Sequence, residues 1–243
     1  MCENADFAPF YIARGAFFER DGPVRSATDY KKAVELDAGS WRARHILVAY
    51  HLRQGQKTEA LAAARQAAAD FPKEVPLQID LAETLLTVGQ PADIAAVLDA
   101  VAALPYEGAS DIYGLYVRAQ VGIGISAMQK AAWPAAVEAL EKSKLYPERL
   151  GTGAPFHPDT RMQDTLIALA LDRMGEKDKA AALRQAIRDY TLTYWDESLP
   201  HGYFGGLILE KLGRKEDRLK ARELLGRAAR PSAEILELIR RLP

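Results

Sequence analysis

Cysteine, long apolar runs and an excess of either charge are all scarce in this 243-residue sequence. The single cysteine, Cys2, cannot form a disulfide within the chain. Lys and Arg number 32 against 33 Asp and Glu, and this balance argues against a dedicated nucleic-acid-binding protein, which would carry a basic excess. The longest stretch without Asp, Glu, Lys or Arg, 198–209, is too short for a membrane span and contains proline and glycine, so no such span is expected.

Signatures of targeting, catalysis and metal binding are missing as well. Residues 1–10 have neither a basic start nor an apolar stretch, so we expect no secretory signal there, and the compartment stays open. His45 and His51 are six positions apart, on different faces of a helix, whereas zinc-binding helices space their histidines four apart. Residues 122–127 match the G-x-G-x-x-A dinucleotide pattern, but no β-branched strand precedes them. We therefore predict a non-enzymatic chain without metal or cofactor.

Alanine is the most frequent residue type, and the sequence repeats itself with a period near 34. Gly55 and Gly89 are one full period apart, and Pro72 and Pro105 are one position short of it. Each glycine follows one amphipathic helical pattern and each proline ends a second, because glycine adopts the positive φ that terminates a helix and proline cannot continue one. The pattern predicts helices at 41–53, 59–71, 76–88, 92–104, 160–174 and 178–190.

The period and the order of small and large residues resemble the tetratricopeptide repeat (TPR). Small residues let two helices approach closely where they cross, while leucines fill the neighbouring grooves. The resemblance implies an all-α fold: a right-handed superhelix of antiparallel helix hairpins with a C-terminal capping helix. In the third repeat the pattern reads Leu81-Ala82, Leu85, Gly89, Ile94, Leu98, Val101 and Pro105.

We expect a single TPR-like array whose spacing departs from the period at two places. The step from Ile94 to Ala136 exceeds the period by eight, and the extra length extends a helix through 112–129. The step from Ala136 to Ala180 exceeds it by ten, and the excess falls on a long loop, 146–159, whose three prolines and two glycines exclude a helix. The expected repeats are 8–38, 40–72, 76–105, 111–147, 159–191 and 201–229, followed by the capping helix at 232–242.

Repeat arrays present the first helix of each hairpin on their concave side. Residues expected to face this groove mix apolar and charged types, which suits a peptide or a neighbouring protein domain. Interior packing is the open alternative for the apolar ones. The candidate binding residues are Arg42, His45, Glu83, Arg118, Met162 and Tyr203; Ala49, Ile79, Leu86, Val121, Thr165 and Leu169 share their register.

The long loop and the residues just after it form a second candidate surface. Ordered loops of this length are often functional, and the alternative is a structural cover. Tyr194, Trp195 and Tyr203 precede the last hairpin, where they can stack on sugars or pack in the core. The loop candidates are Arg149, Phe156, His157, Asp159, Arg161 and Asp164.

Two segments carry a narrower resemblance. They are similar to the C-terminal TPR region of a family of large bacterial proteins of unknown function. The first segment is residues 6–11 with Arg14, and the second is residues 145–153 with the Pro and Asp residues that follow. In that family a β-rich, carbohydrate-enzyme-like portion precedes the repeats. The resemblance implies that this chain is a fragment whose partner is that portion. We expect a protein-interaction or scaffolding module; a carbohydrate-binding element and a self-associating homo-oligomer remain open.

Overall fold

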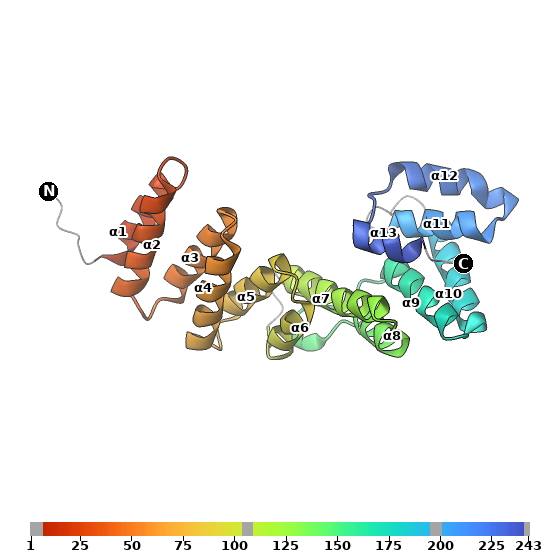
Figure 1. The fold of residues 1–243 in the computed structure, drawn as a ribbon, viewed down its shortest axis with the longest axis horizontal. Coiled ribbons are helices and arrows are strands. Elements are labelled where there is room, and N and C mark those ends of the chain that lie inside the picture. Colours follow the sequence, from red (N-terminus) through yellow and green to blue (C-terminus); the bar gives the residue numbers. More distant parts are fainter. Residues whose placement is uncertain (1–6, 104–108, 195–200, 241–243) are drawn as a thin grey trace. The chain divides into compact units, whose positions relative to one another are not determined.

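The computed structural model describes residues 7–103, 109–194 and 201–240, which hold α-helices and short 3-10 turns but no strand (Figure 1). The all-α prediction is confirmed. The helices are α1 (Ala8–Phe18), α2 (Pro23–Leu36), α3 (Trp41–Arg53), α4 (Lys57–Asp70), α5 (Val75–Thr87), α6 (Pro91–Asp99), α7 (Ala109–Gln129), α8 (Trp133–Lys142), α9 (Arg161–Arg173), α10 (Lys177–Thr193), α11 (Gly202–Leu212), α12 (Arg218–Arg227) and α13 (Ala233–Ile239).

The helices fall into two compact units, residues 1–116 with 148–151 and residues 117–147 with 152–243. In the first unit α1 packs on α2, α3 on α4 and α5 on α6, and each pair also contacts the next (Figure 1). The first helices of two successive hairpins, α3 and α5, contact each other directly. This nearest-neighbour stacking is how hairpins that cannot bury an apolar face alone build a shared core.

Residues in the left-handed conformation mark the turns inside the hairpins. Gly55 and Gly89 have φ of 68° and 73°, so the predicted glycine turns are confirmed. The next such residues that lie between the two helices of a hairpin are Ala131 and Gly175; Gly151, also left-handed, lies in the loop between α8 and α9. The steps from 89 to 131 and from 131 to 175 exceed the period by eight and by ten, which are the two departures that the sequence predicted. Ala131 has φ of 56°, a conformation that costs a residue with a side chain about 1–2 kcal/mol.

The residues in excess of the repeat period lie in the two places that the repeat spacing predicted. Helix α7 has 21 residues, against 13 in α3 and in α5, so the predicted lengthening is confirmed. Between α8 and α9 the chain is irregular apart from one 3-10 turn, Glu148–Leu150. That turn corrects the expectation that 146–159 holds no helical residue. Leu150, the last residue of this turn, is fully buried.

One helix ends earlier than expected. The sequence predicted a helix at 92–104, whereas α6 ends at Asp99. The guanidinium of Arg149 donates hydrogen bonds to the carbonyl oxygen of Leu98 and, at 2.7 Å, to the carboxylate of Asp99. The amide of Ala103 donates to the carbonyl oxygen of Arg149 at 2.7 Å. A residue far along the chain therefore satisfies the backbone that would have continued the helix.

Small residues lie at helix crossings. Ala82 is fully buried, and a Cβ built on Gly124 would lie 2.7 Å from Cγ of Leu140 on α8. Gly124 is inside α7, so the dinucleotide-like segment 122–127 is helical throughout and follows no strand. The glycine serves close packing between α7 and α8.

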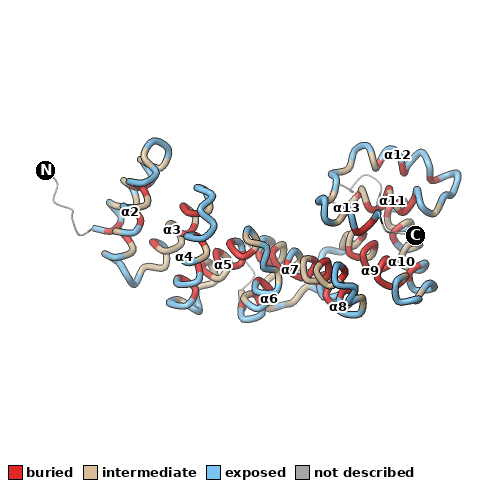
Figure 2. The backbone as a smooth tube through the Cα atoms, viewed as in Figure 1, coloured by how far each residue is buried: buried red, intermediate tan, exposed pale blue. Residues whose placement is uncertain are grey.

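The second unit is built around α9. Within α9 the seven consecutive residues from Thr165 to Leu171 are all buried, so the helix has no open face over nearly two turns (Figure 2). This corrects the expectation that Thr165 and Leu169 line a groove, and Val121 is buried in the same core. Helix α13 contributes Leu238 and Ile239 to that core. Ile235 and Leu236 of the same helix are partly buried and pack against this core.

Candidate functional site

The exposed face of α3 and α5 brings together three of the six groove candidates. Arg42 and Glu83 are exposed, and His45 is partly exposed, on the first helices of two adjacent hairpins. His45 Nδ1 lies 2.8 Å from Oδ2 and 3.0 Å from Oδ1 of Asp80, so a histidine on α3 is joined to a carboxylate on α5. Ala49, Ile79 and Leu86, which were expected on the same face, are half-buried.

The charges on this face favour a protonated histidine. The hydrogen bond with Asp80 raises the pKa of His45; partial burial opposes this, and the negative charges of Asp80 and Glu83 add to it. The guanidinium of Arg42 lies 4.5 Å from the ring centre of Trp41, which holds its long side chain against α3. The face therefore combines fixed cations, carboxylates and partly exposed aliphatic side chains.

The other three groove candidates belong to the second unit. Arg118 is exposed on α7. Met162 and Tyr203 are half-buried and pack against the core around α9. The sequence placed all six on one concave side, and the structure brings together the first three.

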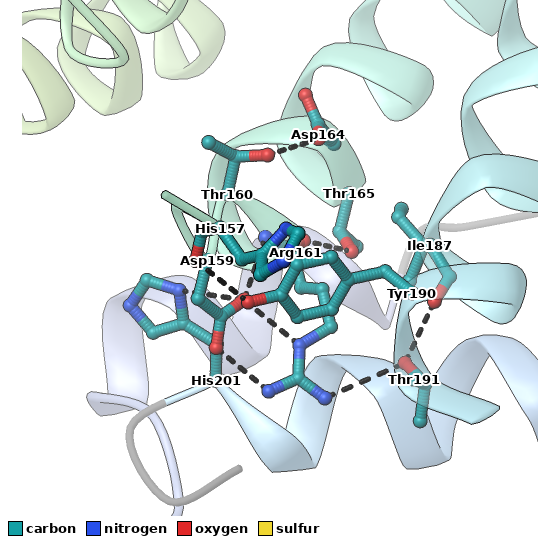
Figure 3. Close-up of polar contacts among 10 residues, drawn as sticks. All are labelled: His157, Asp159, Thr160, Arg161, Asp164, Thr165, Ile187, Tyr190, Thr191 and His201. Carbon is teal, nitrogen blue, oxygen red and sulfur yellow. Dashed lines mark hydrogen bonds and ion pairs between the residues drawn. The ribbon is translucent and has the colours of Figure 1, made fainter. Parts of the chain in front are cut away.

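The loop candidates Asp159 and Arg161 form a polar cluster beneath the loop (Figure 3). Arg161 is 2% exposed and donates to Asp159 from Nε at 2.8 Å and from Nη2 at 2.7 Å. Its Nη1 donates to Thr191 Oγ1 at 3.4 Å, and its guanidinium lies 5.3 Å from the ring centre of Tyr190. This two-pronged pair is a geometry in which arginine binds carboxylates strongly.

The cluster reaches α11 as well. His201 Nδ1 lies 3.6 Å from Oδ1 of Asp159. Burial alone would raise the pKa of Asp159, but the hydrogen bond from Arg161 and the contact with His201 outweigh it and hold that pKa well below its usual range. A Cβ on Gly205 would lie 2.5 Å from Thr191 Oγ1 and 3.0 Å from Arg161 Nη1. Gly205 and Thr191 were missed as members of this cluster, although a Gly-Gly pair inside a helical pattern is a signal of close approach.

Two further loop candidates are engaged inside their own units. Asp164 accepts from Lys144 Nζ at 2.9 Å and from Thr160 Oγ1 at 2.6 Å, which joins α8 to the start of α9. Arg149 fixes the end of α6 in the first unit. Together with Asp159 and Arg161, four of the six loop candidates therefore bind to other residues of their own unit.

The remaining two loop candidates are aromatic and exposed. Phe156 is 92% exposed, and its ring centre lies 4.5 Å from that of His157. The His157 ring lies 4.6 Å from Tyr194, and Tyr190 donates from its hydroxyl to the carbonyl oxygen of His157 at 3.1 Å. The loop thus rests on the end of α10 and presents Phe156 outward.

Other features bear on the remaining expectations. The expectations for Trp195 and Cys2 lie outside the described residues, and Tyr203 packs against the core. Within the described ranges, no group of three or more His, Cys, Asp or Glu side chains is placed to hold a metal ion. None of the described helices is both long and apolar enough to cross a membrane.

Comparison with family models and with curated proteins gave no match. Among solved structures, the chain is similar to the MamA protein, with a TM-score of 0.50 and 15% identity over 77% of this chain and 94% of that one. It also matches YrrB, described as a TPR protein with an unusual peptide-binding site (TM-score 0.48, 15% identity, 91% and 93% covered). PilF of Pseudomonas aeruginosa matches with a TM-score of 0.49 and 18% identity, at 95% of each chain. The likeness to MamA concerns the fold alone, and the described residues form stacked helix hairpins.

Proposed function

We propose that this chain is a non-catalytic protein-interaction module that binds a peptide or protein segment along the α3/α5 face. One observation carries the proposal: Arg42, the His45–Asp80 pair and Glu83 lie on adjacent first helices beside the half-buried Ile79 and Leu86. A partner buries apolar side chains against the aliphatic residues, and its charges pair with the flanking ones. Such charge pairs set register and specificity more than raw affinity.

The organisation of the whole chain is part of the same proposal. The six expected repeats form a single array, in which the hairpins of α3 and α5 contribute their first helices to the binding side. The narrower family resemblance proposes the β-rich portion of a parent chain as the partner, and a separate protein is the other possibility. Co-expression of this chain with such a β-rich portion, followed by size-exclusion chromatography, distinguishes the two partners. Co-elution supports the β-rich portion, and separate elution supports a separate protein.

Peptide selection tests the α3/α5 face directly. A phage-displayed library of random peptides is selected on the wild-type chain, and the recovered peptides are measured by fluorescence anisotropy against a variant carrying Arg42→Glu and Glu83→Lys. We expect binding at least tenfold weaker in this variant. Lys31→Glu, at an exposed position of α2, is the matched control and keeps binding within twofold. Equal binding by all three proteins contradicts the proposal.

The sugar alternative is checked with the same proteins. Tryptophan fluorescence is followed across a panel of oligosaccharides. A saturable response to a glycan, together with failure to select any peptide, would replace the peptide-binding proposal.

A further inference from the structure

Helix α13 joins the core around α9 in the second unit. Helix α9 pairs with α10 as the first helix of its hairpin, yet the whole run from Thr165 to Leu171 is buried. The corresponding helix of the first unit, α5, keeps Glu83 exposed and leaves Ile79 and Leu86 half-buried. Helices α8, α10 and α11 all contact α9, and Leu238 and Ile239 of α13 join the same core on its groove side.

A shared hollow and one hydrogen bond place α13 at this groove. Leu238 borders a hollow of about 260 Å³ together with Trp133, Leu169 and Arg173, which belong to α8 and α9. Gln129, the last residue of α7, donates to Glu234 in the first turn of α13 at 2.6 Å. Helix α13 therefore lies against the end of α7, the start of α8 and the middle of α9, and Figure 1 shows it beside α9.

Helix α13 is short and only partly buried. It has seven residues, and helices shorter than about 12–15 residues are marginal without tertiary support. Leu238 and Ile239 are 5% exposed, but Ile235 and Leu236 are only partly covered, and the hydrogen bond between Gln129 and Glu234 is exposed. A short, partly exposed helix over an incompletely filled hollow belongs to the part of a protein that opens at low free-energy cost.

We propose that α13 is an exchangeable occupant of this groove, and that the other occupant is an amphipathic helix of a partner protein. The chain's own helix defines the chemistry of that partner: two apolar pairs spaced as 235/236 and 238/239, and an acidic residue in the first turn opposite Gln129. This is the helix-in-groove mode of recognition. The groove lies in the second unit and is independent of the α3/α5 face, so this inference goes beyond the proposed function.

Binding in this groove requires α13 to leave. The apparent affinity for a partner helix is then the intrinsic affinity reduced by the fraction of molecules in which α13 is detached. Substitutions that detach α13 consequently tighten the binding of an added helix. A substitution that removes contacts from the binding surface would instead weaken it.

The probe is a fluorescein-labelled synthetic peptide with the sequence of residues 231–243, added to the full chain. In fluorescence anisotropy we expect a variant carrying Leu238→Asp and Ile239→Asp to bind this peptide at least tenfold more tightly than the wild type does. Leu219→Asp, at a position of α12 that is 78% exposed, is the control and binds like the wild type. A peptide with Asp at the positions of Ile235 and Leu238 shows no binding to any of the proteins.

Equal binding by the wild type and the double variant, or binding of the altered peptide, overturns the proposal. Hydrogen exchange on the wild type is a second test that does not depend on a variant folding. Amides of α13 are expected to exchange at least tenfold faster than those of α9, and equal protection overturns the proposal. A concentration-dependent dimer of the wild type in sedimentation would assign a second copy as the occupant and also overturn it. Arg42→Glu with Glu83→Lys leaves this peptide's binding unchanged, so failure here is separable from failure of the proposed function.

Discussion

Replacing Gly124 with alanine tests the close crossing of α7 and α8. The new Cβ would lie 2.7 Å from Cγ and 3.0 Å from Cδ2 of Leu140, and 3.4 Å from the carbonyl oxygen of Ala136. Leu140 is fully buried, and the nearest contact is at its branch point, so the side chain cannot swing aside. One of the two helices has to move.

The expected cost follows from two opposing effects. Overpacking a tight core costs about 1–3 kcal/mol, and a contact to a branch point belongs in the upper half of that range. Alanine regains about 0.5–1 kcal/mol over glycine inside a helix. Gly124→Ala should therefore lower the free energy of unfolding by about 1–2.5 kcal/mol, a loss of about 2–10 °C in melting temperature for a chain of this size.

Urea denaturation followed by circular dichroism measures this change. Gly226→Ala is the matched control, because a Cβ there meets nothing within 4 Å and Gly226 lies in the last turn of α12. That variant should gain up to about 0.5 kcal/mol. Adding Leu140→Ala to Gly124→Ala should cost no more than Leu140→Ala alone, since the vacated space accepts the new Cβ. If Gly124→Ala is stabilised like Gly226→Ala, the helix crossing is not as described.

Three further substitutions report on local features. Ala131→Gly should stabilise the chain by about 0.5–1 kcal/mol in urea denaturation, because glycine relieves the left-handed backbone; a loss of stability would contradict this. Asp159→Ala leaves a buried guanidinium unpaired and should cost about 3–5 kcal/mol near pH 6. Folding lowers the pKa of Asp159, so the stabilisation that its carboxylate provides is complete above the unfolded pKa and is lost as pH falls through the folded pKa. The stability difference between the wild type and Asp159→Ala should therefore narrow below about pH 4. A difference that stays constant with pH argues against the Asp159–Arg161 pair. Folding raises the pKa of His45, so the stabilisation from the protonated imidazole is complete below about pH 6.5 and is lost as pH rises through the folded pKa. Melting curves from about pH 5.5 to 8.5 should show this loss of stability in the wild type and not in Asp80→Asn.

Local rules were enough to predict the hairpins. The turns at Gly55 and Gly89 depend on one backbone conformation that glycine adopts freely, and the small residues at the crossings recur with the period of the repeat. The excesses of length were located correctly because they shift every later position in the pattern.

Long-range contacts account for what the sequence could not predict. Helix α6 ends at Asp99 because Arg149, far along the chain, binds its last carbonyl and carboxylate. Arg161 was expected at a loop surface, as charged residues usually are, and only the arrangement of α10 and α11 around the loop buries it. Leu169 was expected in an open groove, and the position of α13 depends on tertiary packing that no repeat period encodes.

Photo-crosslinking at the α3/α5 face is the most direct test of the interaction role. A benzoylphenylalanine replaces Ile79 in one protein and the 81% exposed Val24 of α2 in another, and each is irradiated with a peptide selected on the wild type. The account predicts a crosslink from position 79 that an excess of unlabelled peptide competes away, and none from position 24. Crosslinking from position 24 alone, or equally from both, would contradict the assignment of binding to the α3/α5 face.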